Sequence, residues 1–348
     1  MWVTGLYEES HGIVGNKMWD PEFKASFSMS NIETRWWDGG EPIWITAALQ
    51  GKKSGVYFWP GSEVTIKNIT ATSTKPYNSS IPFAERAEQV IQWLKQDYDL
   101  VMTYYHEPDK TGHSYGPDSK EVEQAVKMVD QNLGMLIERL KEEKLLSKVD
   151  MLVVSDHGMA KVIYDKEHVL DLSEHDVLKD IERVVEEGVI FSFYPKPGRK
   201  KAVLAKLRAI NFNMTVYRKE DIPEHFHYKK NRRVPPIVIL PDEGYLVYQI
   251  FNATWMKGVK GEHGYSNDLV SMNPIFFARG PNFKRQFTMP RFETVNIYPM
   301  VCQILGLTPA PNNGSVGAIV EMFTSGGLRP RAWSILWLIG TLLLLLVL

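Results

Sequence analysis

Residues 99–117 read "DLVMTYYHEPDKTGHSYGP" and contain both features on which the fold prediction rests. The apolar run at 100–104 is typical of a strand buried on both faces, as in a covered parallel sheet. The proline and glycines that follow indicate a loop at the end of this strand. Asp109 and His113 lie four positions apart in that loop. The stretch therefore places chemically active side chains directly after a predicted buried strand.

The same order of strand, turn and helix recurs on both sides of this stretch. Strand-like apolar runs occupy residues 42–49, 54–60, 149–156 and 271–280, and helical patterns occupy 82–96, 118–144 and 293–307. Such alternation predicts an α/β fold in which helices cover both faces of a mainly parallel sheet. Residues of about 165–260 are less regular and predict a smaller inserted lobe.

Two further motifs repeat the combination of acid, imidazole and glycine. Asp156 and His157 stand in "SDHGM" at the end of a predicted strand, and His263 stands in "GEHGYSND". One Asp–His pair alone is more often a surface ion pair, so the prediction depends on the three motifs together. Carboxylate and imidazole ligands without thiolate favour zinc, with manganese or iron as alternatives.

Five candidate ligands are too many for one tetrahedral ion, so we expect two metal ions in one cleft. Such a pair stabilises both the entering and the leaving oxygen of a phosphoryl group, which makes phosphoester cleavage the leading chemistry. Asn16, in "GIVGNKMWDP", is a candidate donor to a phosphoryl oxygen, although an ordinary turn residue is an equal reading. The aromatic residues Tyr57, Phe58, Trp59 and Trp19 could form a cage for a quaternary ammonium group, although strand aromatics are more often core.

Composition limits the function classes that remain. With 348 residues and 44% hydrophobic content, the chain can form one large domain. Its net charge of -1 offers no general field for nucleic acid, and the basic clusters at 199–201 and 229–233 are expected to be solvated. Cys302 is the only cysteine, which excludes an internal disulfide and a cysteine zinc site.

The apolar C-terminus and the glycosylation sequons point to the cell surface. Residues 332–348 are almost wholly apolar and follow a short linker at 324–331. We expect a lipid-anchor signal there, with a membrane span or a buried helix as alternatives. The beginning of the chain shows no signal peptide, which leads us to expect a missing N-terminal part. Asn-x-Ser/Thr sequons occur at Asn68, Asn78, Asn213, Asn252 and Asn313.

The ordered motifs closely resemble those of the ectonucleotide pyrophosphatase/phosphodiesterase family of the alkaline phosphatase superfamily. They are "VTGLYEESHGIVGNKMWDP", "GEPIWITA", "FWPGSEV", "EPDKTGHSYGP", "VSDHGM", "GEHGYSND" and "ILGLTPAPNNGS". The resemblance covers nearly the whole chain before the tail. It implies an alkaline-phosphatase-like catalytic domain over residues 1–323 and the short, membrane-tethered type.

The resemblance also assigns roles to particular residues. It implies one zinc ion held by Asp109, His113 and His263, and a second held by Asp156 and His157 together with a further aspartate and a threonine nucleophile. It implies that Asn16 stabilises the phosphoryl oxygen. Tyr77, in "KPYNSS", resembles the aromatic residue that stacks on a nucleotide base or faces a choline headgroup. Phe58, Trp59 and Tyr115 are further candidates for substrate binding, which the resemblance does not assign.

The sequence departs from the family pattern at its start. In the family the first-strand aspartate and the threonine nucleophile precede "VTGLY", where this sequence begins. We therefore expect an N-terminally truncated chain with an incomplete second zinc site, feeble turnover and a sheet that lacks a central strand. The full-length form is expected to cleave extracellular nucleotide phosphodiester or pyrophosphate bonds through a covalent intermediate. The alternatives are a choline-headgroup phosphodiesterase resembling alkaline sphingomyelinase and a silent metal-binding surface protein.

Overall fold

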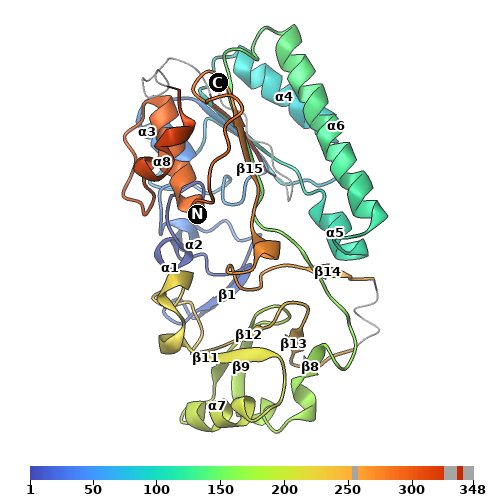
Figure 1. Cartoon of the computed structure of the whole chain (residues 1–348). Helices are drawn as coiled ribbons and strands as arrows, with labels where there is room; N and C mark the ends of the chain where they lie inside the picture. The colour runs from blue at the N-terminus through green and yellow to red at the C-terminus, as the bar shows by residue number, and fades with distance from the viewer. Residues whose placement is uncertain (253–257, 325–334, 340–348) are drawn as a thin grey trace.

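The computed structural model describes residues 1–252, 258–324 and 335–339. A helix-covered sheet forms the larger part of the molecule, and a smaller sheet lies at its other end (Figure 1). The predicted α/β fold with a mainly parallel central sheet is confirmed. Within the described parts of the chain, no helix combines the length and apolar composition needed to cross a membrane.

The central sheet has the strand order β15-β6-β16-β5-β3-β4. All neighbouring strands are parallel except β15, which pairs antiparallel with β6 at one edge. The strands span Ser54–Tyr57 (β3), Ser73–Lys75 (β4), Leu100–Tyr104 (β5), Asp150–Val154 (β6), Phe276–Arg279 (β15) and Ile335–Ile339 (β16). The strands β3 and β6 are buried along their whole length, as expected of covered parallel strands.

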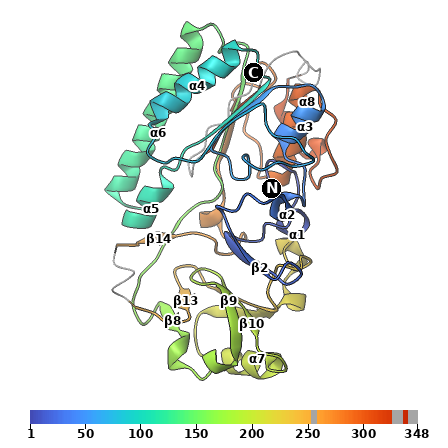
Figure 2. The same ribbon diagram turned by 180° about the vertical axis from the view of Figure 1, so that it is seen from behind.

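Helices cover the two faces of this sheet, as Figures 1 and 2 show from opposite sides. On one face lie α4 (Phe83–Lys95) and α6 (Lys120–Glu142), which pack with Val101 of β5. On the other lie α3 (Ile43–Leu49) and α8 (Ile297–Leu305), which pack with Met102. Val101 and Met102 are adjacent in β5 but belong to different hydrophobic cores, because successive side chains point to opposite faces of a strand.

The strand expected at residues 42–49 is wrong, because this stretch forms the helix α3. Ile43, Trp44, Ile45 and Ala47 are all buried, so the stretch is apolar on every side. A short apolar run without clear periodicity does not distinguish a buried strand from a buried helix. In the structure α3 packs against β3 of the sheet and against α8.

The expectation that the sheet lacks a central strand is also wrong. The segment β16 pairs in parallel with both β5 and β6, from Ile335 opposite Leu100 and Asp150 to Ile339 opposite Tyr104 and Val154. A continuous run of apolar residues has the composition of a fully covered parallel strand. The rest of residues 332–348, where a membrane anchor is predicted, lies outside the described residues.

The smaller part of the molecule is built on an antiparallel sheet with the order β11-β12-β10-β9. Helix α7 packs on this sheet. The two-stranded pairs β13-β8 and β14-β7 lie in the segments that connect this sheet with the central sheet. The elements are β9 (Ile181–Glu186), β10 (Phe191–Pro195), α7 (Lys200–Arg208), β11 (Met214–Arg218), β12 (Ile237–Pro241), β8 (Val169–Asp171), β13 (Leu246–Tyr248), β7 (Ala160–Lys161) and β14 (Gly261–Glu262).

The N-terminal segment lies between the two sheets (Figure 1). It contains α1 (Glu8–His11), the hairpin of β1 (Lys17–Asp20) and β2 (Ala25–Ser28), and α2 (Thr34–Trp37). Asp20 is fully buried and accepts hydrogen bonds from Arg232 and Arg233. The expectation that residues 229–233 are solvated is therefore wrong for Arg233, which is 5% exposed.

Candidate metal centre

The first two ligand candidates lie on α5 (Asp109–Tyr115), a seven-residue helix where the sequence suggested an irregular loop. Pro108 directly precedes it, and proline is favoured at helix starts because it needs no hydrogen-bond acceptor for a backbone N–H. Asp109 and His113 are one helical turn apart, so they share a face. The four-residue spacing noted in the sequence therefore brings both side chains to one point.

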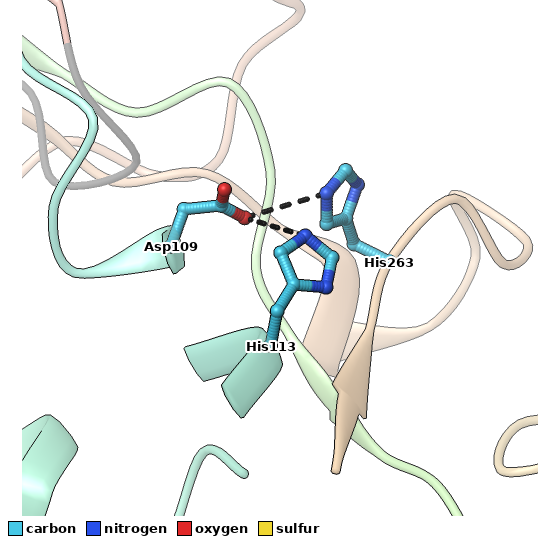
Figure 3. Close-up of side chains that lie close together, drawn as sticks. All are labelled: Asp109, His113 and His263. Atoms are coloured by element: carbon cyan, nitrogen blue, oxygen red, sulfur yellow. Dashed lines mark ion pairs between the residues drawn. The ribbon is translucent and has the colours of Figure 1, made fainter. Parts of the chain in front are cut away.

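His263 reaches the same point from the segment after β14 (Figure 3). Oδ1 of Asp109 lies 3.2 Å from Nε2 of His113 and 3.4 Å from Nε2 of His263. One ligand atom from each residue lies within 4.8 Å of the other two. Gly261 permits this approach, because a Cβ there would lie 2.5 Å from the carbonyl oxygen of Gly112 in α5.

Hydrogen bonding orients His113 toward the cluster. Its Nδ1 donates to the carbonyl oxygen of Gly261 at 2.8 Å, which leaves Nε2 facing Asp109. A hydrogen bond with Asp109 raises the pKa of His113 to about 9. Burial alone raises the pKa of Asp109, but hydrogen bonds from His113 and His263 outweigh it and hold that pKa well below its usual range.

The donor set fits a divalent metal ion. Two imidazole nitrogens and one carboxylate oxygen converge, and this combination is favoured by zinc. The hydrogen bond from Nδ1 of His113 to a backbone carbonyl is also the usual support of a metal-binding histidine. The charge of His113 helps to lower the pKa of Asp109, and a bound ion would supply positive charge in its place.

The second pair of candidates lies directly beside the first cluster. The ring of His157 stacks on His263 with centroids 3.4 Å apart, and Nε2 of His157 lies 3.5 Å from Oδ2 of Asp156. Desolvation raises the pKa of Asp156, although its side chain is 36% exposed, and the charge of Asp109 raises it further. The structure thus brings all five predicted ligands to one edge of the central sheet.

An aromatic cluster extends from this edge to the surface. Tyr104, at the end of β5, has a pKa raised by burial and further by the charges of Asp156 and Asp109. Its ring lies 6.0 Å from Tyr77, which lies 5.6 Å from Phe58. Tyr77 is 58% exposed, so its side chain is accessible to a ligand.

Comparisons with known proteins decide the family. The model of the family described as "Type I phosphodiesterase / nucleotide pyrophosphatase" matches residues 2–266. The chain is 36% identical over 328 residues to human "Ectonucleotide pyrophosphatase/phosphodiesterase family member 5", covering 93% of this chain and 68% of that protein. The chain belongs to the ectonucleotide pyrophosphatase/phosphodiesterase family. Its members hydrolyse phosphodiester and pyrophosphate bonds, and the predicted enzyme class is confirmed.

Two further relatives are similar to this phosphodiesterase over most of its length. The chain is 39% identical over 318 residues to the "Bis(5'-adenosyl)-triphosphatase enpp4" of Xenopus laevis, covering 90% of this chain and 69% of that protein. A solved structure of murine ectonucleotide pyrophosphatase/phosphodiesterase 5, in an inactive threonine-to-alanine variant with AMP, aligns with a TM-score of 0.87 and 38% identity. That alignment covers 93% of this chain and 86% of the murine chain.

The remaining predicted site residues of the phosphodiesterase lie in different surroundings. Trp59 is 6% exposed and packs in the main core, with its ring 6.1 Å from Trp2. Tyr115 ends α5 and is 48% exposed, with Nζ of Lys260 5.9 Å from its ring. Asn16 is exposed immediately before β1.

Sequence reasoning missed two supports of the site. Glu262 places Oε2 3.6 Å from Nδ1 of His113, and its Oε1 accepts a hydrogen bond from Tyr164 at 3.0 Å. Arg86 is fully buried beneath the aromatic cluster, where it donates to the carbonyl oxygen of Tyr104 at 2.6 Å and lies 4.8 Å from the Phe58 ring. Glu262 adjoins His263, which is the one signal that could have identified it.

Proposed function

We propose that this phosphodiesterase hydrolyses nucleotide phosphodiester or pyrophosphate bonds with two divalent metal ions, zinc being favoured. The observation that carries the proposal is the exposed ring of Tyr77, which lies 6.0 Å from the ring of Tyr104, and the pKa of Tyr104 is raised in part by the charges of Asp156 and Asp109. A nucleotide has a phosphoryl group for the metal cluster and a flat base for the ring. Base–aromatic stacking contributes about 1–3 kcal/mol.

The proposed metal ligands divide into two sets. Asp109, His113 and His263 would hold one ion, and Asp156 and His157 would contribute to the second. When bound, such ions supply charge that stabilises the entering and leaving oxygens of the phosphoryl group. The family resemblance adds an aspartate and a threonine nucleophile to the second set.

The chain's own polar and aromatic groups would orient the substrate. The side-chain amide of Asn16 would donate to a phosphoryl oxygen, where charge develops in the transition state. Tyr77 would stack on the base. The murine relative with bound AMP supports this arrangement, because a nucleotide binds there in a variant whose threonine is replaced.

A choline-headgroup substrate is less favoured, because protein cations already occupy the aromatic faces that would hold it. The guanidinium of Arg86 lies over Phe58, and that of Arg183 lies 3.7 Å from the Trp19 ring. Trp59 is buried in the core. A quaternary ammonium cage needs several free aromatic faces around one cation, and Tyr77 alone among these rings is exposed.

We also propose an extracellular location at the cell surface. Four of the sequon asparagines are exposed, namely Asn68, Asn78, Asn213 and Asn313, so glycans could be accommodated without unfolding. A membrane anchor at residues 332–348 is an alternative to the pairing of β16 in the central sheet, and the absence of a nucleic-acid surface is part of this proposal. Digestion of the secreted protein with a glycosidase, followed by a mass measurement, tests the glycosylation.

Hydrolysis assays of two forms test the function. One is the chain of residues 1–348, and the other is the same chain preceded by the aspartate- and threonine-bearing segment of its murine relative. Each receives zinc and either a nucleotide diester or a phosphocholine ester. We expect the extended form to cleave the nucleotide ester at least about a hundredfold faster than the unextended form, because a covalent nucleophile is added. Preference for the phosphocholine ester, or no turnover by either form, would contradict the proposal.

A further inference from the structure

Glu186, at the end of β9, lies against the backbone of the turn that carries Asn16. A Cβ built on Gly15 would lie 2.8 Å from Oε2 and 3.0 Å from Oε1 of Glu186. Both carboxylate oxygens therefore face this turn. A Cβ at residue 15 would therefore displace the carboxylate from this position.

The carboxylate also makes directed interactions with the turn. The backbone N–H groups of Lys17 and Asn16 lie near this carboxylate and oppose the rise of its pKa. On the same turn, the carbonyl oxygen of Val14 accepts a hydrogen bond from Tyr228 at 3.0 Å. Glu186 and Tyr228, which both come from the smaller part of the molecule, thus contact this turn at Gly15 and Val14.

We propose that Glu186 is a positioning residue, which fixes the turn at Gly15–Lys17 so that the Asn16 amide faces the phosphoryl group of a bound nucleotide. This inference rests on the proposed role of Asn16. Glu186 itself need not touch the substrate, because it acts on the Asn16 backbone. Charge-assisted hydrogen bonds from N–H groups to a carboxylate are stronger than those to a neutral acceptor, which suits this role.

The protonation state of Glu186 should govern how firmly the turn is held. Burial raises the pKa of Glu186 to about 7, and the N–H groups and the charge of Lys17 oppose this rise only in part. Lys17 on β1 and Tyr228 are the titratable groups that face it. A protonated carboxyl turns one acceptor into a donor, so the turn should loosen below about pH 7.

A double-mutant cycle on AMP binding tests the inference without requiring turnover. AMP is titrated into the zinc-loaded chain of residues 1–348 and into Glu186→Gln, Asn16→Ala and the double variant. Glutamine keeps the volume of Glu186 but replaces one acceptor oxygen by a donor, so we expect AMP affinity to fall about five- to tenfold. In the Asn16→Ala background, Glu186→Gln should lower AMP affinity almost no further, because the Asn16 amide that Glu186 positions is already absent.

Two controls separate positioning from loss of structure. Glu182→Gln lies on the same strand in an exposed position and should leave AMP affinity unchanged. The fall in affinity below pH 7 should be smaller in Glu186→Gln, since an amide does not titrate. Equal effects of Glu186→Gln with and without Asn16, or no effect at all, would overturn this inference alone. Failure of the unaltered chain to bind AMP would overturn the proposed function and this inference with it.

Discussion

Single residues decide whether the cluster beside α5 can hold an ion. His263 is the one member of the triad that comes from outside α5, so it closes the site. We expect His263→Ala to lower zinc affinity about a hundredfold or more, since the loss of a supporting residue alone already costs about ten- to a hundredfold. Competition with a chromophoric chelator measures this. His168→Ala, which removes a histidine paired with Asp165 in the smaller part, should leave zinc affinity unchanged.

Substitutions of Tyr77 test whether the nucleotide base stacks on its ring. Replacement of its exposed ring by alanine should weaken AMP binding by about 1–3 kcal/mol, whereas Tyr77→Phe keeps the ring face and should bind within about twofold of the unaltered chain. Calorimetric titration with AMP distinguishes the two variants. Equal losses in both would show that the hydroxyl, rather than stacking, makes the contact.

At the scale of elements, the buried ion pair of Asp20 joins β1 to the segment of Arg232 and Arg233. Oδ2 of Asp20 lies 2.8 Å from Nε of Arg233, and the two side chains are 0% and 6% exposed. Asp20→Asn would leave the charge of Arg233 unpaired in the interior. We expect a loss of about 3–5 kcal/mol in the free energy of unfolding, measured by urea denaturation. Glu22→Gln, which removes an exposed partner of Arg232, should cost less than about 1 kcal/mol.

The ion pair of Asp20 also makes the stability of the fold depend on pH. Burial alone raises the pKa of Asp20, but hydrogen bonds from Arg232, Arg233 and two backbone N–H groups lower it to about 2. Because the pKa is lower in the folded state, the stabilisation is fully present above the unfolded value of 3.8 and is lost as the pH falls toward 2. Asp20→Asn should therefore show a smaller loss of stability between pH 5 and pH 2.5 than the unaltered chain, in thermal unfolding experiments.

Elements also show what the sequence could predict. The strand β5 and the helix α6 were predicted from apolar patterns, and the structure brings together Asp109, His113 and His263 from two of the predicted motifs, whose role as metal ligands stays a prediction. The helix α3 did not, because its residues are apolar on all sides and only packing separates helix from strand. Glu186 was missed because nothing in the sequence connects it with Gly15, and only the contact between β9 and β1 brings them together.

At the scale of the whole molecule, β16 joins the two halves of the central sheet. It pairs with β5 on one side and β6 on the other, so its loss would leave two buried edges unpaired. We expect Trp337→Pro to lower the melting temperature by several degrees, because proline removes a ladder hydrogen bond and does not fit a central strand. Differential scanning fluorimetry checks this. Trp337→Phe, which keeps the backbone N–H, is the control, and an equal shift in both variants would argue against pairing by β16.

The most direct measurement for the whole account is AMP binding with and without metal. AMP is titrated into the chain of residues 1–348 as zinc-loaded protein, after chelation, and after zinc is restored. We predict binding with zinc, a loss of at least about tenfold in affinity after chelation, and recovery on addition of zinc, because phosphoryl binding would depend on ions held by Asp109, His113 and His263. The same AMP affinity in all three states would contradict a metal-dependent nucleotide site in this phosphodiesterase.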